Sequence, residues 1–366
     1  MELVSLPAAC DAHPFVANMT LGPLSIDYVH IHYCSLAGLP LLSALLLLLW
    51  LAALFYFLGS TADGYFSPTL ASLSDRLRVP HDVSGVTFLA FGNGAPDVFS
   101  AIAAYSSGVG EAGINELLGG AVFVSTVVVG AVAVASSVQV QRWAFVRDVG
   151  AFLASLLLLM MLAISSSGGD LGDTAVAALL FLALYGLYVA SVVFPVCVAR
   201  YRAAEAEIRD AEIVKKTSMM ISAFWHALSP RVAVGYITRA SNSLLGLTVL
   251  AWGNSVGDLI TDVSVARAGF PQMAIAGCFG GPVFNVLLGL GLPMLYACVR
   301  GRSEDLALDI HAWISLSFLF VSLTSSLLVF RRHRYHCPPW YGKLLMVYYF
   351  IYSLLNLAVA FRVVIV

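Results

Sequence analysis

The sequence predicts an all-α protein that crosses a membrane several times and is built from two inverted repeats. Three observations predict it: the composition, a succession of long apolar segments, and a polar motif that occurs twice. Of the 366 residues, 60% are hydrophobic and 11% are charged, whereas soluble domains carry about 25% charged residues. The net charge is only −2, and the basic residues lie between apolar segments. We therefore expect the lipid bilayer as a partner, no nucleic acid, and no protein partner that the sequence identifies.

Nine segments are apolar over the roughly 20 residues that span a bilayer. They are residues 40–62, 83–106, 117–138, 144–165, 174–198, 243–266, 273–297, 309–330 and 344–366. Basic residues are enriched in cytosolic loops, and their alternation places the N-terminus outside the cytosol and residues 199–218 inside. With nine spans the basic stretch 331–343 would lie outside. We therefore expect about ten spans, with a short or defective sixth span between residues 219 and 241.

These spans predict four parts of the chain. Residues 1–39 form an extracytosolic segment, and residues 40–198 form the first repeat domain. Residues 199–241 hold a cytosolic loop and the remnant sixth span, and residues 242–366 form the second repeat domain.

The N-terminal segment contains Cys10 and Cys34 on either side of a glycosylation sequon at Asn18. A disulfide and a glycan would both place this segment on a lumenal or extracellular side, although such sequons also occur by chance. Mitochondrial transit peptides are Arg-rich, but the first basic residue is Arg76. The plasma membrane or an endomembrane is therefore favoured over the mitochondrial inner membrane.

The repeated motif indicates a gene duplication. VTFLAFGNGAPD (86–97) matches LTVLAWGNSVGD (247–258), and the same offset of 161 brings GGAVFV (119–124) onto GGPVFN (280–285). Two consecutive helices therefore recur without an insertion. If the sixth span exists, five crossings separate the copies, which then face opposite ways. Inverted repeats are typical of secondary transporters, whose substrate sites lie near the midplane at the repeat interface.

The motif places an acidic residue inside an apolar segment, where an ionised aspartate costs roughly 2.5–3.5 kcal/mol on insertion scales. Asn93, Pro96 and Asp97 share one helix face because they are spaced i, i+3 and i+4. Pro96 cannot donate to the carbonyl of Gly92, so this oxygen is available to a cation. The second copy supplies Asn254, Ser255 and Asp258, and Pro282 and Asn285 lie on its partner helix.

The carboxylates, amide carbonyls, serine hydroxyl and freed backbone carbonyls of these segments are hard oxygen ligands. Ca²⁺ takes 6–8 such oxygens. Two carboxylates would neutralise one Ca²⁺, or accept Na⁺ or protons instead, and competition for shared oxygens would couple two fluxes. The sequence therefore predicts transported Ca²⁺ and a monovalent cation, with no cofactor and no catalytic residue.

The motifs GNGAPD, GNSVGD and GGPVFN resemble the two alpha-repeats of the Ca²⁺/cation antiporter superfamily. The resemblance covers residues 25–140 and 240–300 and points to the branch of plant and protist cation/calcium exchangers and the mitochondrial sodium/lithium/calcium exchanger. It implies a sodium/calcium exchanger-like fold and an antiporter that exchanges Ca²⁺ for Na⁺, K⁺, Li⁺ or H⁺ by alternating access. The metal-site residues that it implies are Asn93, Pro96, Asp97, Asn254, Ser255, Asp258, Gly281 and Asn285.

The sequence departs from better-known exchangers in two respects. Aspartates stand at positions 97 and 258, where those exchangers have glutamates. The aspartates are a feature shared with the branch named above. The sixth span is shortened, so the alternative of a transport-deficient, truncated relative stays open.

A rival from another class is a Mg²⁺-dependent intramembrane prenyltransferase. Asn254, Asp258 and Asp262 form N-x₃-D-x₃-D, which resembles the diphosphate motif of such enzymes. The first copy has Ala101 where a second motif would need an aspartate, so we expect a transporter and no enzyme.

Several polar and small residues have a structural interpretation beside the functional one. Asn93 and Asn254 could simply bond neighbouring helices, and Asp63 and Asp262 lie near helix ends, where water could reach them. Glu111 and Glu116 are expected in a solvated loop. Close helix packing alone would also explain the paired glycines, which are Gly119, Gly120, Gly280 and Gly281.

Overall fold

The computed structural model describes residues 39–61, 67–77, 79–106, 110–136, 138–165, 171–203, 251–301, 306 and 308–365. The chain divides into two compact units, one of Met1–Leu58 with Asp210–Ser241 and one of Gly59–Arg209 with Asn242–Val366. The predicted disulfide, glycosylation site and sixth span, together with Asp63, lie outside the described residues. The described part of the first unit is the start of α2 (Pro40–Thr61), which coincides with the first predicted span.

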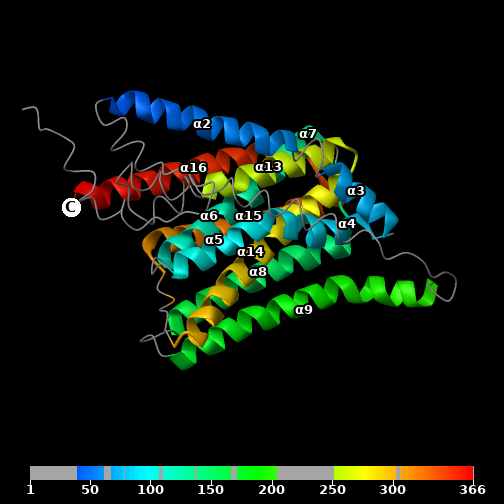
Figure 1. Cartoon of the computed structure of the whole chain (residues 1–366). Coiled ribbons are helices and arrows are strands. Elements are labelled where there is room, and N and C mark those ends of the chain that lie inside the picture. The colour runs from blue at the N-terminus through cyan, green and yellow to red at the C-terminus, as the bar shows by residue number, and fades with distance from the viewer. Residues whose placement is uncertain are drawn as a thin grey trace, which may run out of the picture. The chain divides into compact units, whose positions relative to one another are not determined.

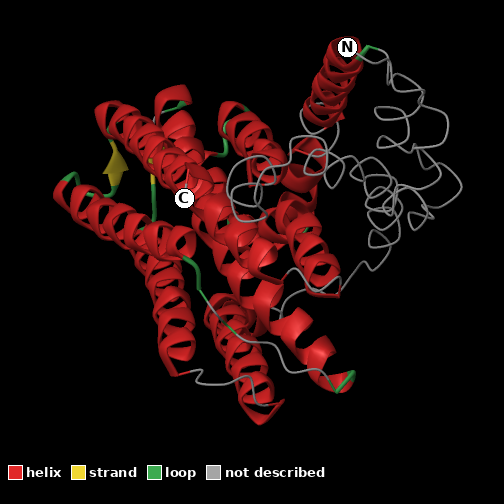
Figure 2. Cartoon of the chain, turned by 90° about the vertical axis from the view of Figure 1, so that its left-hand side faces the viewer, coloured by secondary structure: helices red, strands yellow, loops and turns green. Residues whose placement is uncertain are grey.

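In its described residues, the second unit is helical apart from two short strands and the turns between elements (Figures 1 and 2). Its helices are α3 (Ser67–Arg76), α4 (His81–Ser84), η3 (Gly85–Leu89), α5 (Ala90–Ser106), α6 (Gly110–Phe123), η4 (Val124–Val128), α7 (Val129–Ala135), α8 (Arg142–Ser165), α9 (Leu171–Ala203), α13 (Ala251–Arg267), α14 (Pro271–Val299), α15 (Ile310–Arg332) and α16 (Pro339–Ile365). Every predicted span that lies in the described part of the chain is mainly helical there, although the span 117–138 leaves the helix after Ala135 and ends in strand β1 (Val138–Gln139).

Six helical stretches in the described part of the chain are long and apolar enough to cross a membrane. They are Gly113–Ala135, Arg142–Ser165, Gly172–Pro195, Pro271–Val299, Ile310–Arg332 and Pro339–Ala360. The total of about ten spans stays a prediction because residues 204–250 are not described.

The irregular turns of the helices do not occur at the prolines of the motifs. α5 continues through Pro96, and α14 continues through Pro282 and Pro293. The irregular turns are instead the π-helical segments η3 and η4, and such turns are frequent at functional sites. η3 overlaps the first copy of the motif (86–97) and ends three residues before its GNGAPD, and η4 begins at Val124, the residue that the offset pairs with Asn285.

α14 is the central helix of the second unit and packs against η3, α5, α6, α8, α9 and α13 (Figure 1). Glycines allow the backbones to approach closely there. A Cβ atom on Gly94 would lie 2.6 Å from the Phe284 ring, and one on Gly280 would lie 2.7 Å from Val86. The predicted packing role of Gly280 is therefore confirmed.

A second close approach joins α7 to α16. A Cβ atom on Gly130 would lie 2.5 Å from the carbonyl oxygen of Gly342, and one on Gly342 would lie 2.7 Å from that of Gly130. The strands β1 (Val138–Gln139) and β2 (His336–Cys337) pair antiparallel next to this crossing. Together they fix the end of the first hairpin against the C-terminal helices.

We expect Gly342→Ala to destabilise the protein, because the added methyl group would overlap the α7 backbone and overpacking costs about 1–3 kcal/mol. Thermal unfolding in detergent, followed by tryptophan fluorescence, measures the effect. Gly150→Ala is the matched control, since a Cβ atom at that helical position meets no atom within 4 Å. Equal melting temperatures for the two variants would contradict the tight crossing.

Candidate cation site between the two repeats

The first helix of one repeat and the first helix of the other run antiparallel. Asn93 of α5 hydrogen-bonds Asp258 of α13. Leu89, one turn earlier, and Asp262, one turn later, both approach Gly277. Residue numbers therefore rise along α5 as they fall along α13, which is the relation that inverted repeats require.

Asp97 of the first repeat is held by the second repeat. Its side chain is 6% exposed, and its Oδ2 accepts a hydrogen bond from Nδ2 of Asn285 on α14 at 2.5 Å. Gly94 makes this contact possible, because a side chain there would overlap Asn285 and the Phe284 ring. The glycine of GNGAPD is thus required by packing as well as by the site.

Asp258 of the second repeat is held by the first. It is 7% exposed and accepts its hydrogen bond from Asn93, which lies one turn from Asp97 on the same face of α5. The four-residue separation corresponds to about 6 Å along the helix. Both carboxylates therefore face one buried region between the repeats.

Three buried oxygens around this region have no hydrogen-bond partner among the described residues. They are Ser255 Oγ, Asn285 Oδ1 and Asp262 Oδ1. Ser255 faces Gly120, whose added Cβ atom would lie 3.1 Å from the hydroxyl. A buried oxygen without a partner costs about 1–3 kcal/mol, and a cation bound beside such an oxygen would remove that cost.

The electrostatics of the site also favour a cation. Asp258 and Asp262 are four residues apart on α13, about one helical turn, so two ionised carboxylates there would repel each other. In the described part of the chain, no Lys or Arg forms an ion pair with either of them. Gly281 leaves open space, since a Cβ atom there would meet no atom within 4 Å. The donor set of carboxylates, amides and a hydroxyl fits a hard cation.

The structure brings most of the predicted site residues together. Asn93, Asp97, Asp258 and Asn285 are linked by hydrogen bonds across the repeat interface. The side chains of Pro96 and Asn254 lie outside the described part of the chain, so their predicted roles stay predictions.

The structure corrects the expectation for one acidic residue and decides between two for another. Glu116 was expected in a solvated loop, yet it is 4% exposed within α6. For Asp262 both an interfacial position and a place along the ion path were open, and at 1% exposed it is not interfacial. The i, i+4 spacing of Asp258 and Asp262 and the apolar run that follows Glu116 were the signals that could have located them.

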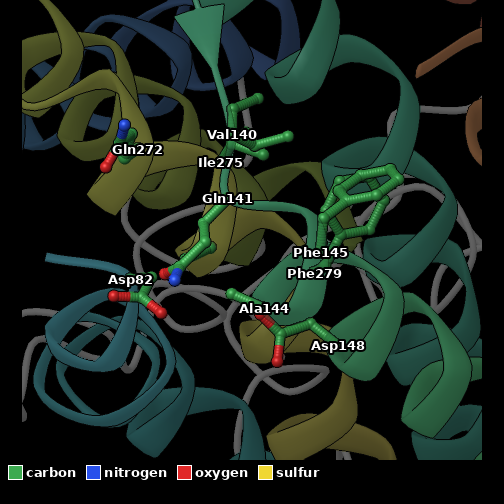
Figure 3. Close-up of a pocket in the computed structure, with 10 residues that line it drawn as sticks. Asp82, Val140, Gln141, Ala144, Phe145, Asp148, Gln272, Ile275 and Phe279 are labelled. Atoms are coloured by element: carbon green, nitrogen blue, oxygen red, sulfur yellow. The ribbon is translucent and has the colours of Figure 1, made fainter. Parts of the chain in front are cut away.

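A separate, mostly apolar pocket lies where α4, α8 and the start of α14 meet (Figure 3). Asp148 lines it, but this carboxylate already accepts hydrogen bonds from Arg147 Nε at 2.8 Å and from the Tyr188 hydroxyl at 3.1 Å. Its charge is therefore matched by an arginine, and we assign no cation to this pocket.

The fold and the repeated motifs have counterparts among known proteins. Cation/calcium exchanger 5 of Arabidopsis thaliana is 28% identical, and the alignment covers 92% of this chain and 86% of that protein. The mitochondrial sodium/calcium exchanger protein of Homo sapiens is 25% identical, with 93% and 85% covered. The first alignment runs over 473 positions, more than this chain has residues, so that relative carries additional segments.

A solved structure of the sodium-calcium exchanger NCX_Mj shares the fold. The TM-score is 0.59 at 18% sequence identity, and the match covers 83% of this chain and 98% of that one. The sequence model of the family described as sodium/calcium exchanger protein matches residues 47–194 and 219–358. The two ranges matched by the family model include most of the sequence and both copies of the motif. This multi-pass membrane protein therefore belongs to the sodium/calcium exchanger family.

Proposed function

We propose that the protein is a secondary active antiporter that exchanges Ca²⁺ for Na⁺, K⁺, Li⁺ or H⁺ by alternating access. One observation carries the proposal: each repeat buries an aspartate and holds the aspartate of the other repeat through an amide. The transported ions are the ligands of this site, with no resident cofactor. The lipid bilayer and inorganic cations are the proposed partners.

The geometry suggests how two ion fluxes are coupled. Asp97 and Asp258 together carry the charge that balances one Ca²⁺, or the same oxygens accept monovalent ions or protons. The amides of Asn285 and Asn93 donate hydrogen bonds to the carboxylates of Asp97 and Asp258. A cation would replace these donors, and the amide oxygens could then turn towards it. Because the oxygens are shared, Ca²⁺ and its counter-ion compete for one site.

Each of the two amide–carboxylate contacts joins one repeat to the other. This arrangement suits alternating access. A change in the position of one repeat relative to the other alters the surroundings of both carboxylates together. The cation would thus be exposed to one face of the membrane at a time. This is the arrangement expected at the interface of inverted repeats.

The relatives support this function over the alternatives. Their names describe cation/calcium and sodium/calcium exchange, and the family is one of transporters, which disfavours a prenyltransferase. The family match resumes at residue 219 and so includes the shortened sixth span, which favours a competent transporter over a degraded relative. We propose the plasma membrane or an endomembrane as its location, although relatives also include mitochondrial proteins.

The first test removes the paired charges. In proteoliposomes, Ca²⁺ uptake driven by an opposing Na⁺, K⁺, Li⁺ or H⁺ gradient should occur in the wild type. Asp97→Asn and Asp258→Asn should each lower the apparent Ca²⁺ affinity about 100-fold, equal to about 2.8 kcal/mol, and the double variant should not transport. Asp173→Asn, at an exposed acid in the first turn of α9, is the control. Exchange that survives in the double variant would refute the site.

The second test concerns the hydroxyl of Ser255, which has no hydrogen-bond partner among the described residues. Ser255→Ala should raise the Ca²⁺ concentration at half-maximal flux about tenfold, the effect of about 1.4 kcal/mol, because one ligand oxygen is lost. Ser155→Ala is the control, since that buried hydroxyl bonds the carbonyl of Phe152 in its own helix. Unchanged flux in Ser255→Ala would remove this residue from the ligand set.

A further inference from the structure

Apart from Asp148, which is paired with Arg147, the described part of each repeat buries one acidic residue in addition to its motif aspartate. Glu116 lies on α6 in the first repeat, and Asp262 lies on α13 in the second. Neither belongs to the duplicated pattern, because the offset of 161 pairs Glu116 with Gly277 and Asp262 with Ala101. Each repeat therefore has its own second carboxylate, at a position that the other repeat leaves small and apolar.

The two carboxylates are held in the same manner. The Ser100 hydroxyl donates to both carboxylate oxygens of Glu116, at 3.1 and 3.0 Å. The Cys278 thiol donates to Oδ2 of Asp262 at 3.1 Å. In both cases the bond joins the first and second helices of one hairpin, α5 to α6 and α13 to α14. Oδ1 of Asp262 is buried and has no hydrogen-bond partner among the described residues.

These two positions lie on opposite sides of the paired aspartates. Ser100, which bonds Glu116, follows Asp97 by three residues, and Asp262 follows Asp258 by four, so each lies roughly 5–6 Å beyond its own motif aspartate. Because α5 and α13 run antiparallel, these displacements point towards opposite faces of the membrane. The carboxylates of Glu116 and Asp262 thus flank the central pair from either side.

We propose that Glu116 and Asp262 form two further cation-binding positions, one on each side of the central site, which receive a hard cation as it moves between that site and one membrane face. The proposal rests on the antiporter function proposed above. A cation that leaves two carboxylates would otherwise enter an apolar region without a ligand. Conduction through a protein requires several moderate binding positions in succession. The charge of Asp262 acts directly on Asp258, so occupancy of one position influences the other.

The test measures the apparent KM for Ca²⁺ separately on each face of oriented proteoliposomes. Glu116→Gln should raise the KM about tenfold on one face, and Asp262→Asn should raise it about tenfold on the opposite face, the effect of about 1.4 kcal/mol each. Glu116→Asp and Asp262→Glu, which keep the charge, should restore most of the affinity. Glu111→Gln, at an exposed acid one turn earlier on α6, controls for a general loss of surface charge.

Changes on the same face for both variants, equal changes on both faces, or unchanged KM values would each overturn the proposal. Thermal melting in detergent identifies a variant that fails to fold, and the charge-preserving variants then provide the comparison. Wild-type protein without Ca²⁺ exchange would instead refute the proposed function. In that case ⁴⁵Ca²⁺ binding to the detergent-solubilised protein tests the inference, since each neutral variant should bind more weakly than the Glu111→Gln control.

Discussion

The structure depends on one constraint: carboxylates buried between apolar helices need a positive partner or a hydrogen-bond donor. The two hairpins that carry the motifs contain a single basic residue, Arg267, at the end of α13. Donors from the opposite repeat, Asn285 and Asn93, therefore hold Asp97 and Asp258. Amides compensate a negative charge only in part, and a mobile cation would complete the compensation. The proposed affinity for cations is thus the expected consequence of the way these helices pack.

Close helix packing makes these exchanges between repeats possible. Asn285 of α14 can reach Asp97 because Gly94 lets α5, and Gly280 lets the preceding segment η3, approach α14 without a side chain at the contact. Glycines that belong to the repeated motifs therefore also set the distance between the helices. A larger side chain at either position would push the helices apart and so separate the Asn285 amide from the Asp97 carboxylate.

The two-fold relation between the repeats is only approximate, and the differences lie at the site. Asn285 corresponds to Val124, where η4 begins, so the amide that holds Asp97 has an apolar counterpart. Glu116 and Asp262 correspond to Gly277 and Ala101. A perfectly symmetric site would present the same ligands to both faces of the membrane. This protein instead combines a symmetric pair of aspartates with surroundings that differ on the two sides.

The sequence by itself determined the helical spans, the duplication with its offset of 161, and the identity of the paired aspartates, because apolar length and side-chain chemistry are local properties. Helical periodicity also showed that Asn93 and Asp97 share a face. Periodicity does not say which helix that face meets, so only the tertiary structure decided that Asn285 bonds Asp97 and that Asn93 bonds Asp258. Burial of Glu116 was decided in the same way, since a carboxylate near the start of an apolar run is solvated or enclosed according to what packs over it.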